Sequence, residues 1–221
     1  MKLFISALTK FLVGLLMVAA LIFLPAGTLA YPGGLLFLCL LFVPMLIMGA
    51  VMLARARDLL RKRLDAKEKQ GDQKGVVALS GLIFLGGFVL AGLDFRFGWS
   101  EVPLPAVIGA SVLFLTGYGL YAEVMRENAY LSRTVQVEAG QTVISTGLYG
   151  VVRHPMYMAT VLMFLALPLI LGSWYALIPF AFYPVLMVIR IRGEEKLLTA
   201  ELAGYEAYKD TVRYRMIPFI W

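Results

Sequence analysis

The sequence has one histidine, His154, and one cysteine, Cys39, among 221 residues. A single cysteine excludes an intramolecular disulfide and a multi-cysteine metal site, and its place inside an apolar run predicts a small buried side chain. One histidine, together with the lack of an HExxH motif and of a glycine-rich phosphate loop, argues against a zinc hydrolase and a P-loop enzyme. We therefore predict no metal site and no thiol chemistry.

Charge is also scarce, because only 15% of the residues are charged whereas 61% are hydrophobic. A soluble domain is about 45–50% apolar, so this composition indicates an integral membrane protein. A transmembrane helix takes about 20 residues. We therefore predict an all-α polytopic membrane protein with about six transmembrane helices, five being the alternative.

The apolar runs divide the chain into spans joined by short loops. Lys2 and Lys10 before the first run, and Pro25 to Ala30 after it, would also suit a cleaved secretory signal. We interpret this run as a first span instead, because further membrane segments follow at once. The predicted spans cover residues 11–24, 34–54, 76–93, 105–123, 155–171 and 176–189.

Basic residues indicate the orientation. The loop from Arg55 to Lys74 carries eight of them, which is typical of a cytoplasmic loop. With this loop inside, both termini are inside as well, and Arg96 is the only basic residue outside. We therefore expect a multi-pass protein of a prokaryotic cell membrane with cytoplasmic termini, and the net charge of +6 needs no nucleic-acid partner. Asp94 and Arg96 are expected to form an interfacial pair.

A polar segment, residues 126–152, separates the fourth span from the fifth. Val135 to Glu138 alternates as a short strand does, Ala139 to Gln141 suits a turn, and Thr142 to Ile144 suits a returning strand. A small cytoplasmic hairpin and an irregular lid are both compatible with this pattern.

Two polar clusters bracket the last apolar hairpin. His154 precedes Pro155, which suits the first turn of a helix, and a helix N-terminus attracts carboxylate and phosphate groups. The alternative is that His154 only caps the helix. At the end of the last apolar run, Arg190 and Glu194 share a helix face, and Arg192 and Glu195 are close enough to pair.

The second cluster is equally compatible with a solvated helix end. Paired Arg and Glu beside a helix N-terminus suit a zwitterionic, ribose-bearing cofactor. The two clusters together therefore indicate one binding site at the mouth of the hairpin.

These motifs resemble those of the isoprenylcysteine carboxyl methyltransferase family. The pattern is Thr146-Gly147-x-Tyr149-x-x-x-Arg153-His154-Pro155-x-Tyr157, Arg190-x-x-x-Glu194-Glu195, Tyr205-x-x-Tyr208 and Pro218. The resemblance implies an S-adenosyl-L-methionine-dependent membrane methyltransferase that carboxyl-methylates a lipophilic, prenylcysteine-like substrate entering from the bilayer. It also implies a single membrane domain, with residues 1–124 as a four-helix scaffold and residues 125–221 as the cofactor-binding and catalytic part.

The resemblance implies particular site residues as well. Arg190 and Glu194 are expected at the reacting centre, with Arg190 at the substrate carboxylate. The expected cofactor-binding residues are Gln141, Thr142, Val143, Ile144, Tyr149, His154, Pro155, Met156, Tyr157, Glu194 and Glu195. Membrane lipid is an expected partner, whereas nucleic acid and metal are not.

The sequence departs from the family at two places. Gly193 stands where some family members have part of a longer acidic run, so the glutamate that meets the cofactor is left open. The tail from Tyr214 to Trp221 resembles that of membrane sterol reductases, which use NADPH. An NADPH-dependent reductase, a phospholipid N-methyltransferase and a non-enzymatic membrane protein therefore stand as alternatives.

Overall fold

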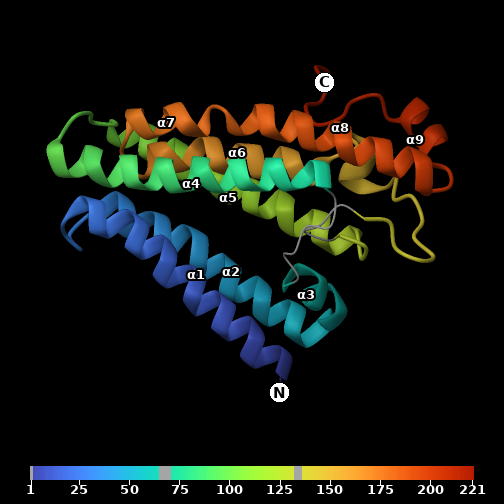
Figure 1. The fold of residues 1–221 in the computed structure, drawn as a ribbon, viewed down its shortest axis with the longest axis horizontal. Coiled ribbons are helices and arrows are strands. Elements are labelled where there is room, and N and C mark those ends of the chain that lie inside the picture. The colour runs from blue at the N-terminus through green and yellow to red at the C-terminus, as the bar shows by residue number, and fades with distance from the viewer. Residues whose placement is uncertain (1, 65–70, 132–135) are drawn as a thin grey trace.

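A computed structural model describes residues 2–64, 71–131 and 136–221 (Figure 1). Within these residues the regular structure is helical and no strand is present. The helices are α1 (Lys2–Ala26), α2 (Pro32–Arg55), α3 (Arg57–Leu64), α4 (Gly71–Phe97), α5 (Leu104–Glu127), η1 (Gly147–Gly150), α6 (Pro155–Ile170), α7 (Trp174–Phe180), α8 (Tyr183–Glu201) and α9 (Tyr205–Thr211).

The predicted fold class is confirmed, with five candidate spans in the described residues instead of the six favoured. They are Lys2–Ala26, Pro32–Arg55, Gln73–Phe97, Leu104–Glu127 and Trp174–Glu201. Helix α6 has 16 residues and is about 24 Å long, shorter than a hydrocarbon core of about 30 Å. Much of α6 is buried, so it lies inside the protein rather than forming a lipid-facing span of full length.

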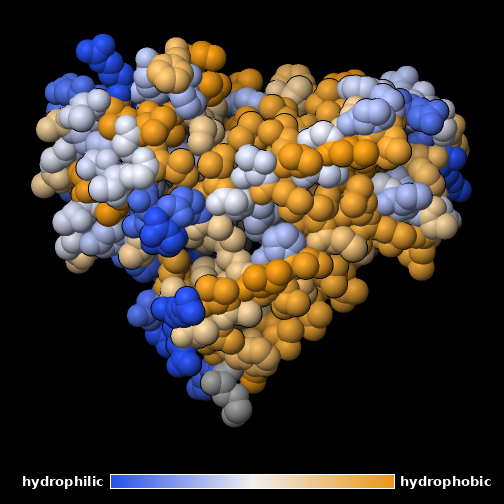
Figure 2. Space-filling model, turned by 180° about the vertical axis from the view of Figure 1, so that it is seen from behind, coloured by the Kyte–Doolittle hydropathy of each residue, from blue (hydrophilic) through white to orange (hydrophobic). Residues whose placement is uncertain are grey.

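The helices pack as a bundle with a diverging hairpin. Helix α5 packs along α6, while α4 contacts α7 and α8. The hairpin of α1 and α2 meets α4 at one end and diverges from the bundle toward the N-terminus (Figure 1). A broad hydrophobic surface lies between more polar ends in Figure 2, as expected of a protein with lipid around its middle. Cys39 is exposed on this apolar part of α2, so the prediction that it is buried was wrong.

Phenylalanine rings fill the centre of the bundle. Phe88 of α4 stacks at an angle against Phe37 of α2, with ring centroids 5.7 Å apart, and against Phe180 of α7, at 6.1 Å. Phe114 of α5 completes the group, 5.9 Å from Phe37. Edge and tilted contacts of this kind add to the free energy of burying the rings. These ring contacts hold α2, α4, α5 and α7 against one another.

Asp94, near the end of α4, joins the turn after α4 to the turn between α6 and α7 instead of pairing with Arg96. Its side chain is fully buried. Its carboxylate accepts hydrogen bonds from the Ser100 backbone N–H at 2.7 Å, the Ser100 hydroxyl at 2.6 Å and the Ser173 hydroxyl at 2.5 Å. The expected interfacial pair is thus corrected: the serines of two neighbouring turns satisfy the carboxylate, while Arg96 lies over the ring of Phe97.

Candidate functional site

One pocket brings the two polar clusters together. It lies where the segment before α6, the first turn of α6, the C-terminal half of α8, and α9 meet. All the predicted cofactor-binding residues except Glu195 line it, and so does Arg190. Asn128, Tyr130, Leu198, Leu202, Tyr205 and Tyr208 complete much of its wall. The roles of these residues stay predictions.

Of the two alternatives for the segment ahead of α6, the described part matches the irregular one, since residues 136–146 contain no strand. Gln141 donates its N–H to the Glu138 carbonyl at 3.0 Å, and its side-chain oxygen accepts from the Glu138 N–H at 2.9 Å. These local bonds replace a strand ladder. Lys62 of α3 holds the segment from outside through a 2.6 Å ion pair with Glu138. Val135, part of the first predicted strand, lies outside the described residues.

Gly147 shapes the turn that delivers Tyr149 to the pocket. Its φ is +50°, a conformation that residues with side chains rarely adopt, and a Cβ there would lie 2.2 Å from a carboxylate oxygen of Glu127. The 3₁₀ turn η1 follows, and Tyr149 is buried with its hydroxyl accepting from the Asn128 side chain at 2.8 Å. Burial raises the pKa of Tyr149 to about 12, so its phenol is neutral at neutral pH.

His154 is the N-cap residue of α6, and its backbone carbonyl accepts the first N–H bonds of the helix. Its side chain makes no capping hydrogen bond, so the imidazole has another partner. Pro155 occupies the first helical position, as predicted, where its missing N–H costs nothing. The His154 ring nitrogen Nε2 lies 3.4 Å from Glu195, and the His154 backbone N–H donates to the Arg215 carbonyl at 2.7 Å.

Tyr157 joins the two predicted reacting-centre residues. Its hydroxyl donates to the Glu194 carboxylate at 2.6 Å and accepts from Nε of Arg190 at 3.0 Å. Arg190 and Tyr157 are both buried. Opposite charges on neighbouring turns of α8 are therefore linked through a phenol of α6, inside the pocket wall.

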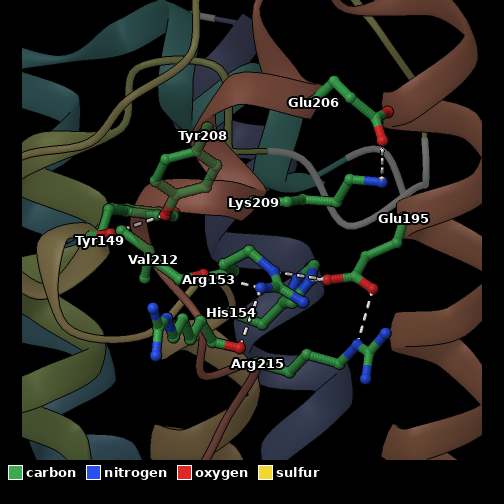
Figure 3. Close-up of polar contacts among 10 residues, drawn as sticks. Tyr149, Arg153, His154, Glu195, Glu206, Tyr208, Lys209, Val212 and Arg215 are labelled. Carbon is green, nitrogen blue, oxygen red and sulfur yellow. Dashed lines mark hydrogen bonds and ion pairs between the residues drawn. The ribbon is translucent and has the colours of Figure 1, made fainter.

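Glu195 does not line the pocket and instead takes part in an ion cluster with Arg153 and Arg215, shown in Figure 3. One of its oxygens accepts from Nε of Arg153 at 2.7 Å, and the other accepts from Nε of Arg215 at 2.7 Å. Arg153 also donates to the carbonyls of Val212, at 2.7 Å, and Arg213, at 3.0 Å. The pairing expected between Arg192 and Glu195 was wrong, because both oxygens of Glu195 are taken by residues distant in sequence. Among the described residues that line the pocket, Glu194 is thus the acidic one from α8.

Two tyrosines of α9 differ in how their hydroxyls are satisfied. The Tyr208 hydroxyl donates to the Tyr149 carbonyl at 2.6 Å, whereas the buried Tyr205 hydroxyl has no hydrogen-bond partner in the described structure. Burial raises the pKa of both phenols above the ordinary value, so both are neutral donors at neutral pH. An unpaired buried hydroxyl in a pocket wall marks a position where a ligand can accept a hydrogen bond.

Sequence reasoning gave no role to several of these residues. Arg153 precedes His154 in the motif, and this position next to a predicted site residue could have marked Arg153 as part of the site. Arg215 and Gln73, which contacts Arg190, gave no such signal, because their partners lie in distant segments. Within the described residues, no group of three or more His, Cys, Asp or Glu side chains is placed to hold a metal ion.

Residues 105–204 match the model of the phospholipid methyltransferase family. This match supports a membrane methyltransferase. The family belongs to the same group of membrane methyltransferases as the isoprenylcysteine carboxyl methyltransferases, and its members generally use S-adenosyl-L-methionine as methyl donor. The matched range contains most of the pocket wall, including both Arg190 and Glu194. A search of curated proteins found no match.

The two neighbouring glutamates should separate a residue that stabilises the fold from one that faces the pocket. Glu195→Gln removes the anion from between two arginines, one of them buried, so it should lower the free energy of unfolding by about 3–5 kcal/mol. Glu194→Gln makes the same chemical change one residue earlier and retains an oxygen that can accept from Tyr157, so it should cost less than about 1 kcal/mol. Thermal unfolding in detergent checks both. An equal loss in the two variants would contradict the separation.

Proposed function

We propose that this protein transfers a methyl group from S-adenosyl-L-methionine to the carboxylate of a lipophilic, prenylcysteine-like acid that enters from the bilayer. The observation that carries the proposal is the Arg190–Tyr157–Glu194 arrangement in a pocket at the end of an apolar helix bundle. The guanidinium of Arg190 suits the carboxylate of the substrate, and the nearby carboxylate of Glu194 suits a positively charged group of the methyl donor.

The residues of the pocket fit a zwitterionic cofactor. Glu194 offers a carboxylate to an ammonium or a ribose hydroxyl, and the phenol faces of Tyr149 and Tyr157 suit a sulfonium cation. The unpaired Tyr205 hydroxyl offers one more donor. We assign cofactor binding to Gln141, Thr142, Val143, Ile144, Tyr149, His154, Pro155, Met156, Tyr157 and Glu194, and a structural role to Glu195.

For methyl transfer the protein needs mainly to align the carboxylate of the substrate with the methyl group of the cofactor. The bound cofactor supplies a methyl group already activated by the positive sulfur. A carboxylate is ionised at neutral pH and needs no general base. Arg190 orients it, Tyr157 fixes Arg190, and the buried wall excludes water, so that a bimolecular transfer proceeds in a held geometry.

The family match favours a second candidate, N-methylation of a phospholipid headgroup. An amine must lose its proton to attack, and Glu194 is then the group that accepts the proton. The two candidate functions share the cofactor and the pocket. They differ in the group that receives the methyl: a carboxylate oriented by Arg190, or an amine beside Glu194.

The distribution of charge supports a cytoplasmic site. The basic helix α3 and the C-terminal tail lie at the same end of the molecule as the pocket (Figure 1). By the positive-inside rule this end faces the cytoplasm, together with both termini.

Tyr205→Phe should change stability and cofactor affinity in opposite directions. Removing an unpaired buried hydroxyl should raise the melting temperature of the cofactor-free protein, while losing a donor to the ligand should weaken S-adenosyl-L-methionine binding about 5–10-fold. Tyr208→Phe is the matched control: it loses a formed hydrogen bond and should lower the melting temperature. Calorimetric titration and thermal unfolding give both quantities. Unchanged cofactor affinity in Tyr205→Phe would refute the assigned contact.

Methyl transfer itself distinguishes the candidate functions. The purified protein is incubated with methyl-tritiated S-adenosyl-L-methionine, N-acetyl-S-farnesylcysteine and vesicles containing phosphatidylethanolamine. We expect a labelled methyl ester of N-acetyl-S-farnesylcysteine, from which mild base releases labelled methanol. Arg190→Gln should reduce the rate of ester formation at least about 30-fold, because a buried charge contact with the substrate is lost. Base-stable label in the ethanolamine lipid would replace the proposal by its second candidate. Saturable NADPH binding without cofactor-dependent label would favour a reductase instead.

A further inference from the structure

Gln73, in the first turns of α4, contacts the predicted carboxylate-binding arginine from outside the predicted site. Its side-chain oxygen accepts from Nη1 of Arg190 at 3.4 Å, and its side-chain N–H donates to the Arg190 backbone carbonyl at 3.5 Å. Gln73 is 4% exposed. A buried amide that meets both the side chain and the backbone of one residue must have a defined position there.

Gly193 makes room for this amide. A Cβ at position 193 would lie 2.0 Å from Nε2 of Gln73, closer than any real contact. The atom in the way is the end of a flexible side chain, so a larger residue at 193 would displace the amide without moving the backbone. The glycine that precedes Glu194 and Glu195 in α8 therefore has a physical reason, which is the close approach of the Gln73 side chain from α4.

Gln73 and Tyr157 hold two different nitrogens of the guanidinium. Tyr157 accepts from Nε at 3.0 Å, and Gln73 accepts from Nη1 at 3.4 Å. A planar guanidinium held at two nitrogens has a fixed plane, which bidentate recognition of a carboxylate requires. The amide oxygen of Gln73 makes its contact without bringing a negative charge to the cation.

We propose that Gln73, admitted by Gly193, is a positioning residue that orients Arg190 toward an anionic acceptor and so contributes to the choice of acids as substrates. The inference rests on the proposed carboxyl methylation. It adds a residue from the part of the chain before residue 124 to the specificity of the site.

A double-mutant cycle tests the pair. Gln73→Met keeps the approximate size and removes the amide, and Gly193→Ala displaces the amide while raising helix propensity. Each single variant should raise KM for N-acetyl-S-farnesylcysteine about 5–10-fold, with the Kd of S-adenosylhomocysteine changed less than about twofold. The double variant should be no worse than Gln73→Met alone, because Gly193→Ala acts only through the amide. Gln73→Glu should raise KM further, since its carboxylate competes with the substrate for Arg190.

The outcomes separate this inference from the function on which it rests. Additive losses in the double variant, or an unchanged KM in Gln73→Met, would overturn the positioning role while a methyl ester formed by the wild type upholds the function. A wild type that forms no base-labile ester would overturn both. Thermal unfolding of each variant checks folding, and Gly193→Ala keeps the test decisive if Gln73→Met is unstable.

Discussion

The ion cluster of Arg153, Glu195 and Arg215 is the interaction on which the rest of the site depends. It joins the start of α6, the middle of α8 and the C-terminal tail, three segments with no local reason to meet. Each buried ion has a neighbour in sequence that faces the pocket: His154 follows Arg153, and Glu194 precedes Glu195. Glu194 and Glu195 are consecutive residues of α8, whose side chains point in different directions, so fixing Glu195 sets the direction of Glu194. Arg153 and His154 lie just before α6, where the backbone N–H of His154 also bonds the carbonyl of Arg215 in the same tail. The structural ions thus determine where the binding groups point.

The scaffold helices contribute more to the site than support. Lys62 of α3 holds the segment before α6 by its ion pair with Glu138, and Gln73 of α4 contacts Arg190. Neither side chain lines the pocket itself: Gln73 acts on it through Arg190, and Lys62 acts on it through the segment that contains Gln141. The phenylalanine core keeps these helices in place, and the Asp94–Ser173 contact closes the far end. A polar site at one end is therefore supported by packing along the whole length of the helices.

The sequence predicted the local features well and the distant pairings poorly. Apolar runs gave the helices, and the motif around His154 and Arg190 gave most of the pocket wall, because neighbouring residues on a turn or helix stay close in any fold. Glu195 shows the limit: helical spacing offered Arg192 as its partner, but the structure supplies Arg153 and Arg215. Asp94 similarly meets Ser173 instead of the nearby Arg96. The alternation at Val137 and Glu138 did not separate a strand from an irregular segment, because the bonds between Glu138 and Gln141 that satisfy this loop are local ones.

Direct photolabelling tests whether the pocket between α6, α8 and α9 holds the methyl donor. The membrane-embedded protein is irradiated with methyl-tritiated S-adenosyl-L-methionine, digested, and the labelled peptides are sequenced. We predict label within residues 141–157 or 194–208, where Tyr149, Tyr157 and Tyr205 line the pocket, and loss of that label with excess S-adenosylhomocysteine. Competable label confined to peptides away from this pocket would contradict it.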